Sequence, residues 1–360
     1  MMSNNSARRR AFPRAPRAAP RAIAAAALLA LPACGESREP LVVYSPHGRD
    51  LLMLAEQVFE TRNPGVDVRW LDMGSQDVLD RIRSERANPQ ADIWFGAPST
   101  MFHSAAGESL LVAYRPSWAD AVPARAQGDG DFYFAVYETP AVIAYNSAAV
   151  PREEAPRDWD EVLAPRWRGE VIIREPLGSG TMRSIFGMMI LRGLVATGDT
   201  AWGFQWLRRL DAHTKEYVFN PALLHQKLVR QEGLVTLWDL PDILLEQDKG
   251  SPFGFTLPTS GSPVIEDAVA IVRGTRHLEA AQRFIDWVGS VEAQLLAARQ
   301  AYRLPARTDL PGDSLPQWAR DVKAALVPAD LDWDLLAQRG QEWMLYWDRH
   351  VRRRGGTGAR

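Results

Sequence analysis

Residues 41–70 have the sequence LVVYSPHGRDLLMLAEQVFETRNPGVDVRW, in which three local patterns follow one another. Residues 41–45 form an apolar segment with two adjacent valines that stops at a proline, which predicts a buried strand. Apolar residues then recur at helical spacing over residues 50–61, and Asn63-Pro64-Gly65 ends that predicted helix. The alternation of apolar and polar residues over 66–70 predicts a second strand.

The same order of elements continues along the chain. Residues 75–87 carry apolar side chains on one helical face, and residues 91–95 predict a third strand. Strand, helix, strand, helix and strand in succession predict an α/β fold with a doubly wound, mainly parallel sheet. Ligands of such sheets bind beyond the carboxyl ends of the strands. Here those ends are residues 44–47, 74–75 and 96–100.

A second α/β unit is predicted after residues 133–146, because a new series of helical and strand patterns begins there. Its centre is the turn Gly178-Ser179-Gly180-Thr181, which precedes a long apolar helix. Residues 262–272 and 279–289 then resemble a return to the first unit. The predicted elements of the second unit are a helix over 159–163, a strand over 167–173, a helix over 182–194 and a strand over 234–238.

The first 33 residues have the composition of an export signal. Six arginines and no acidic residue precede an uncharged run of 12 residues, Ala22–Ala33. A membrane-spanning helix needs roughly 20 apolar residues, so this run is too short to be one. Cys34, the single cysteine of the chain, follows directly, and the junction resembles a bacterial lipoprotein cleavage site. The resemblance implies that Cys34 becomes the lipidated first residue of a protein in the periplasm or at the cell surface, anchored to a membrane.

Composition narrows the class of partner. Without residues 1–33, 36 basic residues face 44 acidic ones, a formal charge of −8. A mildly acidic protein lacks the basic footprint that nucleic acid requires, so no nucleic-acid partner is expected. A single cysteine allows neither an intramolecular disulfide nor a zinc–thiolate site. The basic ending from Arg349 to Arg354 predicts a frayed, solvated tail. We also expect the protein to be a monomer.

Four segments resemble the extracellular solute-binding proteins of bacterial ABC importers, in the branch that binds ferric iron, thiamine and phosphorylated compounds. They are residues 42–45, residues 63–66 together with 91–93, residues 139–146 and residues 261–272. The resemblance implies a two-lobed type II periplasmic-binding-protein fold. Each lobe would hold a doubly wound, mainly parallel sheet, and two crossover strands would join the lobes, which close on a ligand by hinge motion.

The resemblance also implies a division of the chain and a function. The protein would capture a small solute between its lobes and deliver it to ABC permease and ATPase subunits, without a cofactor of its own. A ligand-binding sensor lipoprotein is the alternative. No enzyme is expected, since the sequence contains no nucleophile elbow, zincin helix or Walker loop. The implied parts are a signal peptide (1–33), a tether (34–40), lobe 1 (41–138 plus 262–310), lobe 2 (139–261) and C-terminal helices with a basic tail (311–360).

Two turns are candidates for binding an anion. Gly74-Ser75 and Ser179-Gly180-Thr181 each precede a predicted helix. Glycine lets the backbone approach a ligand closely, and hydroxyls with free amides at a helix N-terminus suit an anion. The alternative is that Ser75, Ser179 or Thr181 only caps its helix. These turns make a phosphorylated organic compound or another small anion the first choice of ligand.

Aromatic residues at strand ends suggest a second choice of ligand. Tyr44, Trp94 and Trp238 are predicted to face the cleft, where a ring can stack on a ligand ring or cation. Trp238 is followed by Asp239, which could hold an ammonium group or hydroxyls. A thiamine-like or amine-bearing solute is therefore the second choice.

Ferric iron is the third choice, and it depends on the end of the first strand. Tyr44, Ser45 and His47 lie there. In iron-binding relatives a histidine or glutamine follows this strand, and two adjacent tyrosines end a strand of the second lobe. His47 matches the first position as a possible metal ligand, but Trp238-Asp239 stands near the place of the tyrosines.

The lipoprotein prediction is tested by Cys34→Ser. The lipid on Cys34 would be the anchor that holds the exported protein, so the variant is expected to be exported but soluble. Fractionation followed by a salt wash of the membranes measures this. A Cys34→Ser protein that stays with the washed membranes would show that the anchor is not a lipid on this residue.

Overall fold

The computed structural model describes residues 38–352. The predictions for the signal segment and for Cys34 lie outside the described residues, as does the end of the basic tail from residue 353 onward. The predicted tether is too long by two residues, because the first strand already begins at Glu39. Glu39 pairs in register with Val66 of the neighbouring strand, and the Arg38 guanidinium donates to the Val66 carbonyl at 2.8 Å.

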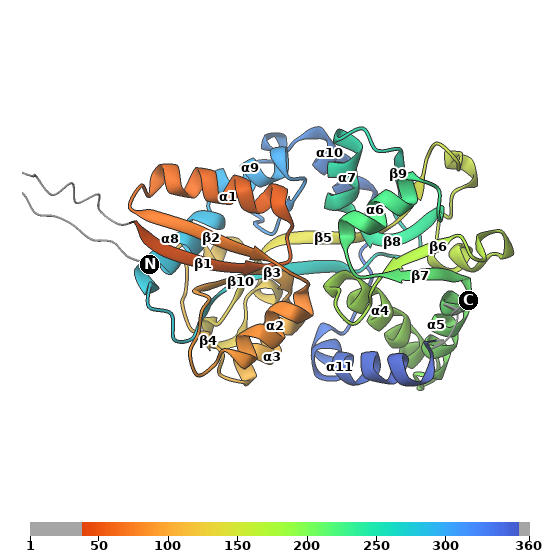
Figure 1. The fold of residues 1–360 in the computed structure, drawn as a ribbon, viewed down its shortest axis with the longest axis horizontal. Coiled ribbons are helices and arrows are strands. Elements are labelled where there is room, and N and C mark those ends of the chain that lie inside the picture. The colour runs from red at the N-terminus through yellow and green to blue at the C-terminus, as the bar shows by residue number, and fades with distance from the viewer. Residues whose placement is uncertain (1–37, 353–360) are drawn as a thin grey trace, which may run out of the picture. The chain divides into compact units, whose positions relative to one another are not determined.

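The chain begins with the predicted alternation of strands and helices (Figure 1). α1 starts after Gly48, whose φ of 76° lies in the left-handed region that glycine adopts freely. The elements as far as the first long strand are β1 (Glu39–Ser45), α1 (Arg49–Arg62), β2 (Val66–Asp72), α2 (Ser75–Ser84), β3 (Ile93–Pro98), α3 (Ser99–Gly107), β4 (Leu111–Val112) and β5 (Phe134–Asn146).

The remaining elements build a second α/β unit and then return to the first. They are β6 (Val171–Arg174), α4 (Gly180–Thr197), α5 (Ala201–His213), β7 (Thr214–Val218), α6 (Pro221–Val229), β8 (Val235–Asp239), α7 (Leu240–Asp248), β9 (Phe253–Thr256), β10 (Val264–Val272), α8 (Leu278–Val288), α9 (Val291–Gln300), β11 (Leu304–Pro305), α10 (Gln317–Ala325) and α11 (Trp333–His350). The predicted helix over 159–163 is a 3-10 helix capped by Asp158.

The strands of residues 38–352 follow the order β2-β1-β3-β10-β5-β8-β6-β7. β2, β1 and β3 are parallel to one another, and so are β8, β6 and β7. β5 joins the two parallel groups, because its first part pairs with β10 and its last part pairs with β8 and β9. This is the predicted two-lobed type II fold, with β5 passing from one lobe to the other (Figure 1). The exact lobe boundaries stay a prediction, since β5 runs through residues 138–139 without a break.

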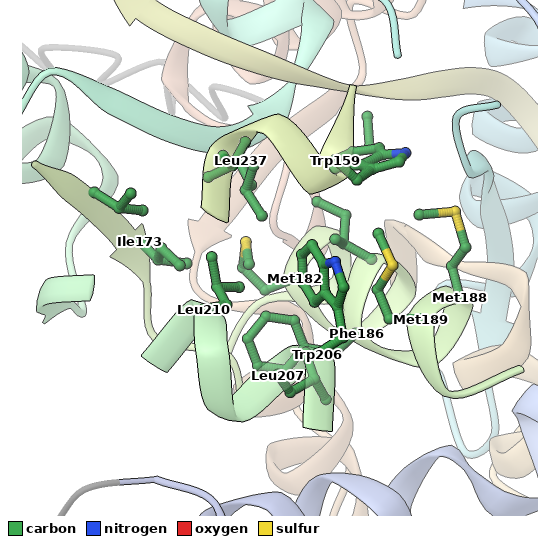
Figure 2. Close-up of a cluster of buried hydrophobic side chains, with 14 of the residues drawn as sticks. Trp159, Ile173, Met182, Phe186, Met188, Met189, Trp206, Leu207, Leu210 and Leu237 are labelled. Carbon is green, nitrogen blue, oxygen red and sulfur yellow. The ribbon is translucent and has the colours of Figure 1, made fainter. Parts of the chain in front are cut away.

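Each lobe has helices on both faces of its strands. In the β1–β3 lobe, α1 and α8 pack on one face and α2 and α3 on the other. In the β6–β8 lobe, α6, α7 and α10 cover one face, and α4, α5 and α11 cover the other. Figure 2 shows the last of these cores, in which Met182, Phe186 and Met189 of α4 meet Trp206 and Leu210 of α5. No helix within residues 38–352 has the length and apolarity needed to cross a membrane.

Several tryptophans of the β6–β8 lobe lie in its hydrophobic core. Trp159, Trp206, Trp343 and Trp347 are buried. Trp202 lies at the surface instead, with 41% of its surface exposed. It lies on α5 beside the close contact with α4, where a Cβ on Gly203 would lie 2.4 Å from the Ile190 Cα.

Candidate functional site

The carboxyl ends of strands from both lobes surround one cavity. Asp72 ends β2, Arg174 ends β6 and Asp239 ends β8, while Asn220 lies just beyond β7. The cavity holds about 390 Å³, at the place where α/β sheets bind ligands. It is lined by Pro46, Asp72, Met73, Gly74, Ser75, Asp77, Arg174, Gly178, Ser179, Gly180, Thr181, Phe219, Asn220, Pro221, Trp238, Asp239 and Asp242.

Seven of the predicted site residues line this cavity together. They are Gly74, Ser75, Ser179, Gly180, Thr181, Trp238 and Asp239. A smaller cavity of about 50 Å³ shares Ser75, Thr181 and Asp239 with the first and adds His47 and Arg303. The structure thus brings together the turns of both lobes, which are a hundred residues apart in the sequence.

Helix N-termini point their amides toward the cavity. α2, α4, α6 and α7 each begin among its lining residues. Side chains cap three of them: Ser179 Oγ accepts from the Met182 amide at 3.3 Å, and Asn220 and Asp239 cap α6 and α7. α2 follows Gly74 and has no side-chain cap. The first amides of a helix have no acceptor within it, so these ends offer donors and a positive dipole to an anion.

The two hydroxyls of the second turn have different roles. Ser179 is the N-cap that the alternative prediction described. Thr181 is not a cap, because its Oγ1 donates to Asp239 Oδ2 at 3.3 Å, across the cavity wall. The turn at residues 179–181 therefore caps a helix and lines the cavity at once.

Arg174 brings a positive charge to the cavity, and the sequence analysis missed it. It ends β6, and its Nε is buried without a hydrogen-bond partner. Within residues 38–352 its guanidinium forms no hydrogen bond or ion pair. Burial lowers the pKa of Arg174, and the charges of Asp242, Asp77, Asp72 and Asp239 oppose that shift. A sequence signal exists, since a charged residue follows the buried strand residues 171–173 and shortly precedes the glycine-rich turn.

Carboxylates outnumber cations in the cavity wall. Asp72, Asp77, Asp239 and Asp242 line it, against Arg174 alone. Burial, followed by the charge of Asp242, raises the pKa of Asp239 to about 8. At neutral pH the empty site therefore holds a proton on Asp239, and a cationic group placed there would displace it.

The aromatic residues of the site differ from the prediction. Tyr44 is 1% exposed within the core beside α2, and its hydroxyl donates to Glu85 at 3.0 Å, so it does not line the cavity. Trp94 is also buried, stacked on Phe102 at 3.9 Å. Both expectations were wrong, because β1 and β3 are covered on both faces and every side chain of β3 is buried.

Trp238 and Phe219 are the aromatic residues of the cavity wall. Trp238 is 3% exposed, and its Nε1 donates to Asp242 Oδ2 at 3.1 Å, so the ring positions a carboxylate. Phe219 is 73% exposed at the rim, between β7 and α6. The sequence analysis did not predict this exposed apolar side chain beside the cavity. Its position in the sequence could have indicated it, because Phe219 stands between Val218, the last residue of β7, and Asn220-Pro221, where α6 begins.

A family model described as bacterial extracellular solute-binding protein matches residues 56–325. The chain belongs to the bacterial extracellular solute-binding proteins. A probable ABC transporter periplasmic-binding protein of Sinorhizobium fredii is 26% identical over 90% of this chain and 89% of the relative. A putative 2-aminoethylphosphonate-binding periplasmic protein of Salmonella typhimurium is 24% identical over 77% of this chain and 81% of the relative.

Solved structures of solute-binding proteins share the fold. The periplasmic binding protein AfuA of Actinobacillus pleuropneumoniae, solved with fructose-6-phosphate, superposes with a TM-score of 0.78. It is 24% identical, and the match covers 88% of this chain and 99% of that chain. This likeness supports the two-lobed architecture.

In this solute-binding protein the end of the first strand is arranged for packing. Ser45 is buried, and its Oγ accepts from the His47 amide at 3.1 Å. The His47 ring packs edge-on against Phe95 and Tyr137, at 4.7 and 5.7 Å between centroids. Burial, followed by the charge of Arg303, holds the pKa of His47 well below its usual range. Within residues 38–352 no group of three or more His, Cys, Asp or Glu side chains is placed to hold a metal ion.

The lobes of this solute-binding protein touch through glycines. A Cβ on Gly180 would lie 2.6 Å from Pro98 Cδ and 2.8 Å from Ser75 Oγ, both in the other lobe. A Cβ on Gly74 would lie 2.9 Å from the Gly178 carbonyl, which accepts weakly from the Gln76 amide at 3.4 Å. These glycines let the N-termini of α2 and α4 approach each other closely.

The raised pKa of Asp239 gives a test that needs no ligand. Its folded-state value is about 8 against an ordinary 3.8, so the stability that the protonated group contributes is lost as pH rises from about 4 to 8. Asp239→Asn removes this loss and keeps a side chain that can cap α7. Its melting temperature is therefore expected to exceed that of the wild type by a margin that grows between pH 5 and pH 8.5.

The control for this measurement is Asp313→Asn, which changes an exposed aspartate and should show no such trend. A margin that stays constant across the pH range for Asp239→Asn would contradict the raised pKa.

Proposed function

We propose that this chain is the substrate-binding component of an ABC importer, and that its ligand is a small organic phosphate or phosphonate that also carries an ammonium group. One observation carries the proposal: the unpaired guanidinium of Arg174 lies in a cavity between the N-termini of α2 and α4. A doubly charged oxyanion accepts several charge-assisted hydrogen bonds at once, which a guanidinium and helix amides can donate.

The excess of carboxylates supports the ammonium group. A ligand with only negative charge would meet Asp72 and Asp242 without compensation and would leave Asp239 protonated. A ligand with a positive end would satisfy them, and Phe219 stands at the rim where it can cover the carbon chain between the two ends. The Salmonella relative named as a putative 2-aminoethylphosphonate-binding protein is consistent with such a zwitterion.

Delivery to permease and ATPase subunits follows from the family, and the membrane anchor is part of the proposal. The signal segment and Cys34 would place a lipid-anchored monomer outside the cytoplasm. We infer that the site holds its ligand without transforming it, since capture and release are what a solute-binding protein contributes to import.

The anion site is tested by Arg174→Gln, with 2-aminoethylphosphonate as the probe in calorimetric titration. Losing a charged donor typically costs roughly 1.5–3 kcal/mol, so affinity is expected to fall about 10- to 150-fold. The melting temperature of the empty protein should fall only modestly, because Arg174 loses charge interactions with nearby aspartates but no hydrogen bond.

Arg183→Gln is the matched control. Arg183 lies one turn into α4, and its guanidinium donates to Gln341 on α11 rather than lining the cavity. Its substitution should change affinity by less than about twofold. Equal affinities for Arg174→Gln and wild type would overturn the anion site. Wild-type protein that binds fructose 6-phosphate but not 2-aminoethylphosphonate would overturn the ammonium part of the ligand class, and binding of neither would overturn the class as a whole.

A further inference from the structure

We infer that Arg352, just beyond the C-terminal helix, is a positioning residue that holds the ligand-binding turn of residues 175–179 in place. The basic ending was expected to be a solvated tail. Arg349 is exposed as expected, but Arg352 is half-buried and folds back onto the β6–β7 region. Its guanidinium reaches Glu175, which is 177 positions earlier in the sequence.

The contact between the two side chains is bidentate. Arg352 Nη1 donates to Glu175 Oε1 at 3.0 Å, and Nη2 donates to Oε2 at 2.7 Å. The guanidinium also lies over the Tyr217 and Trp347 rings, at 4.9 and 5.5 Å from their centroids, and pairs with Asp348 at 3.3 Å. Two parallel bonds and two ring faces fix the guanidinium in orientation, which a single surface ion pair does not do.

Glu175 in turn organises the turn that lines the cavity. Its side chain is buried, and Oε1 accepts from the Leu177 amide at 3.4 Å. Its backbone carbonyl accepts from the Gly178 and Ser179 amides at 3.2 and 3.1 Å. The residues fixed in this way begin immediately after Arg174 and end at the N-cap of α4. Anything that holds the Glu175 side chain therefore holds the amides proposed to bind the anion.

Charge gives a second reason for the contact. Glu175 is next to Arg174, so an unpaired carboxylate there would repel an anion bound by Arg174. Removing one partner of a buried ion pair leaves a charge that the surroundings do not compensate. Arg352 thus supports anion binding both by fixing the turn and by neutralising a carboxylate beside it, although it does not line the cavity.

The structural half of this inference is tested without a ligand. Amide hydrogen exchange is compared for wild type, Arg352→Ala, Arg352→Lys and Arg349→Ala. Arg352→Ala should speed exchange in residues 175–182 and leave residues 74–80 of the opposite lobe unchanged, because only the first segment loses its support. Arg349→Ala removes the same charge three residues earlier, from an exposed position on α11, and should match the wild type. Arg352→Lys keeps one ion pair without the bidentate geometry and should lie between the two.

The functional half rests on the proposed function and uses 2-aminoethylphosphonate in calorimetric titration. A supporting change remote from a ligand typically alters coupling by about 0.5–2 kcal/mol, so Arg352→Ala should weaken affinity about 2- to 30-fold, with partial rescue in Arg352→Lys. Arg349→Ala should bind as the wild type does.

The outcomes separate the two proposals. Unchanged exchange of residues 175–182 in Arg352→Ala overturns the inference, whatever the protein binds. Faster exchange together with a wild type that binds no phosphonate supports the positioning role and overturns the proposed ligand. Exchange that rises equally in both lobes would show that Arg352 only stabilises the whole protein, which also overturns the inference.

Discussion

Strand β5 is shared between the two lobes, and the position of the site depends on this sharing. Its residues 134–140 pair with β10, and residues 141–145 pair with β8. A parallel group of strands lies on each side, and in both groups the carboxyl ends face the same cavity. The ends of β2, β6 and β8 deliver Asp72, Arg174 and Asp239 to one place, although no two of these residues are near in sequence.

The chemistry of the cavity follows from two opposing requirements. Helix N-termini and an unpaired guanidinium favour a strong anion, while several carboxylates would repel it. A ligand with separated positive and negative charges satisfies both requirements. In the empty site, the proton held by Asp239 reduces the electrostatic repulsion among the carboxylates. The glycines at positions 74 and 180 allow the two lobes to meet around such a ligand.

The sequence predicted those features that depend on neighbouring residues. The order of strands and helices, the glycine-rich turns and the Trp238-Asp239 pair could all be identified, because each has a local pattern. Side-chain direction in β1 and β3 could not, since strands buried on both faces lack alternation, and Tyr44 and Trp94 were therefore assigned to the cleft. The roles of Arg174 and Arg352 depend on partners, or the lack of them, in distant segments, which no local pattern reveals.

The measurement that tests the central claim most directly is proton release on binding. Wild type and Asp239→Asn are titrated with 2-aminoethylphosphonate near pH 7.5 in buffers of different ionisation enthalpy. An ammonium group beside Asp239 lowers the raised pKa of its carboxyl, so the wild type should release a proton that Asp239→Asn does not, and wild-type affinity should rise as pH approaches 8. The same proton exchange in both proteins would contradict the account, because it would mean that no cationic group meets Asp239.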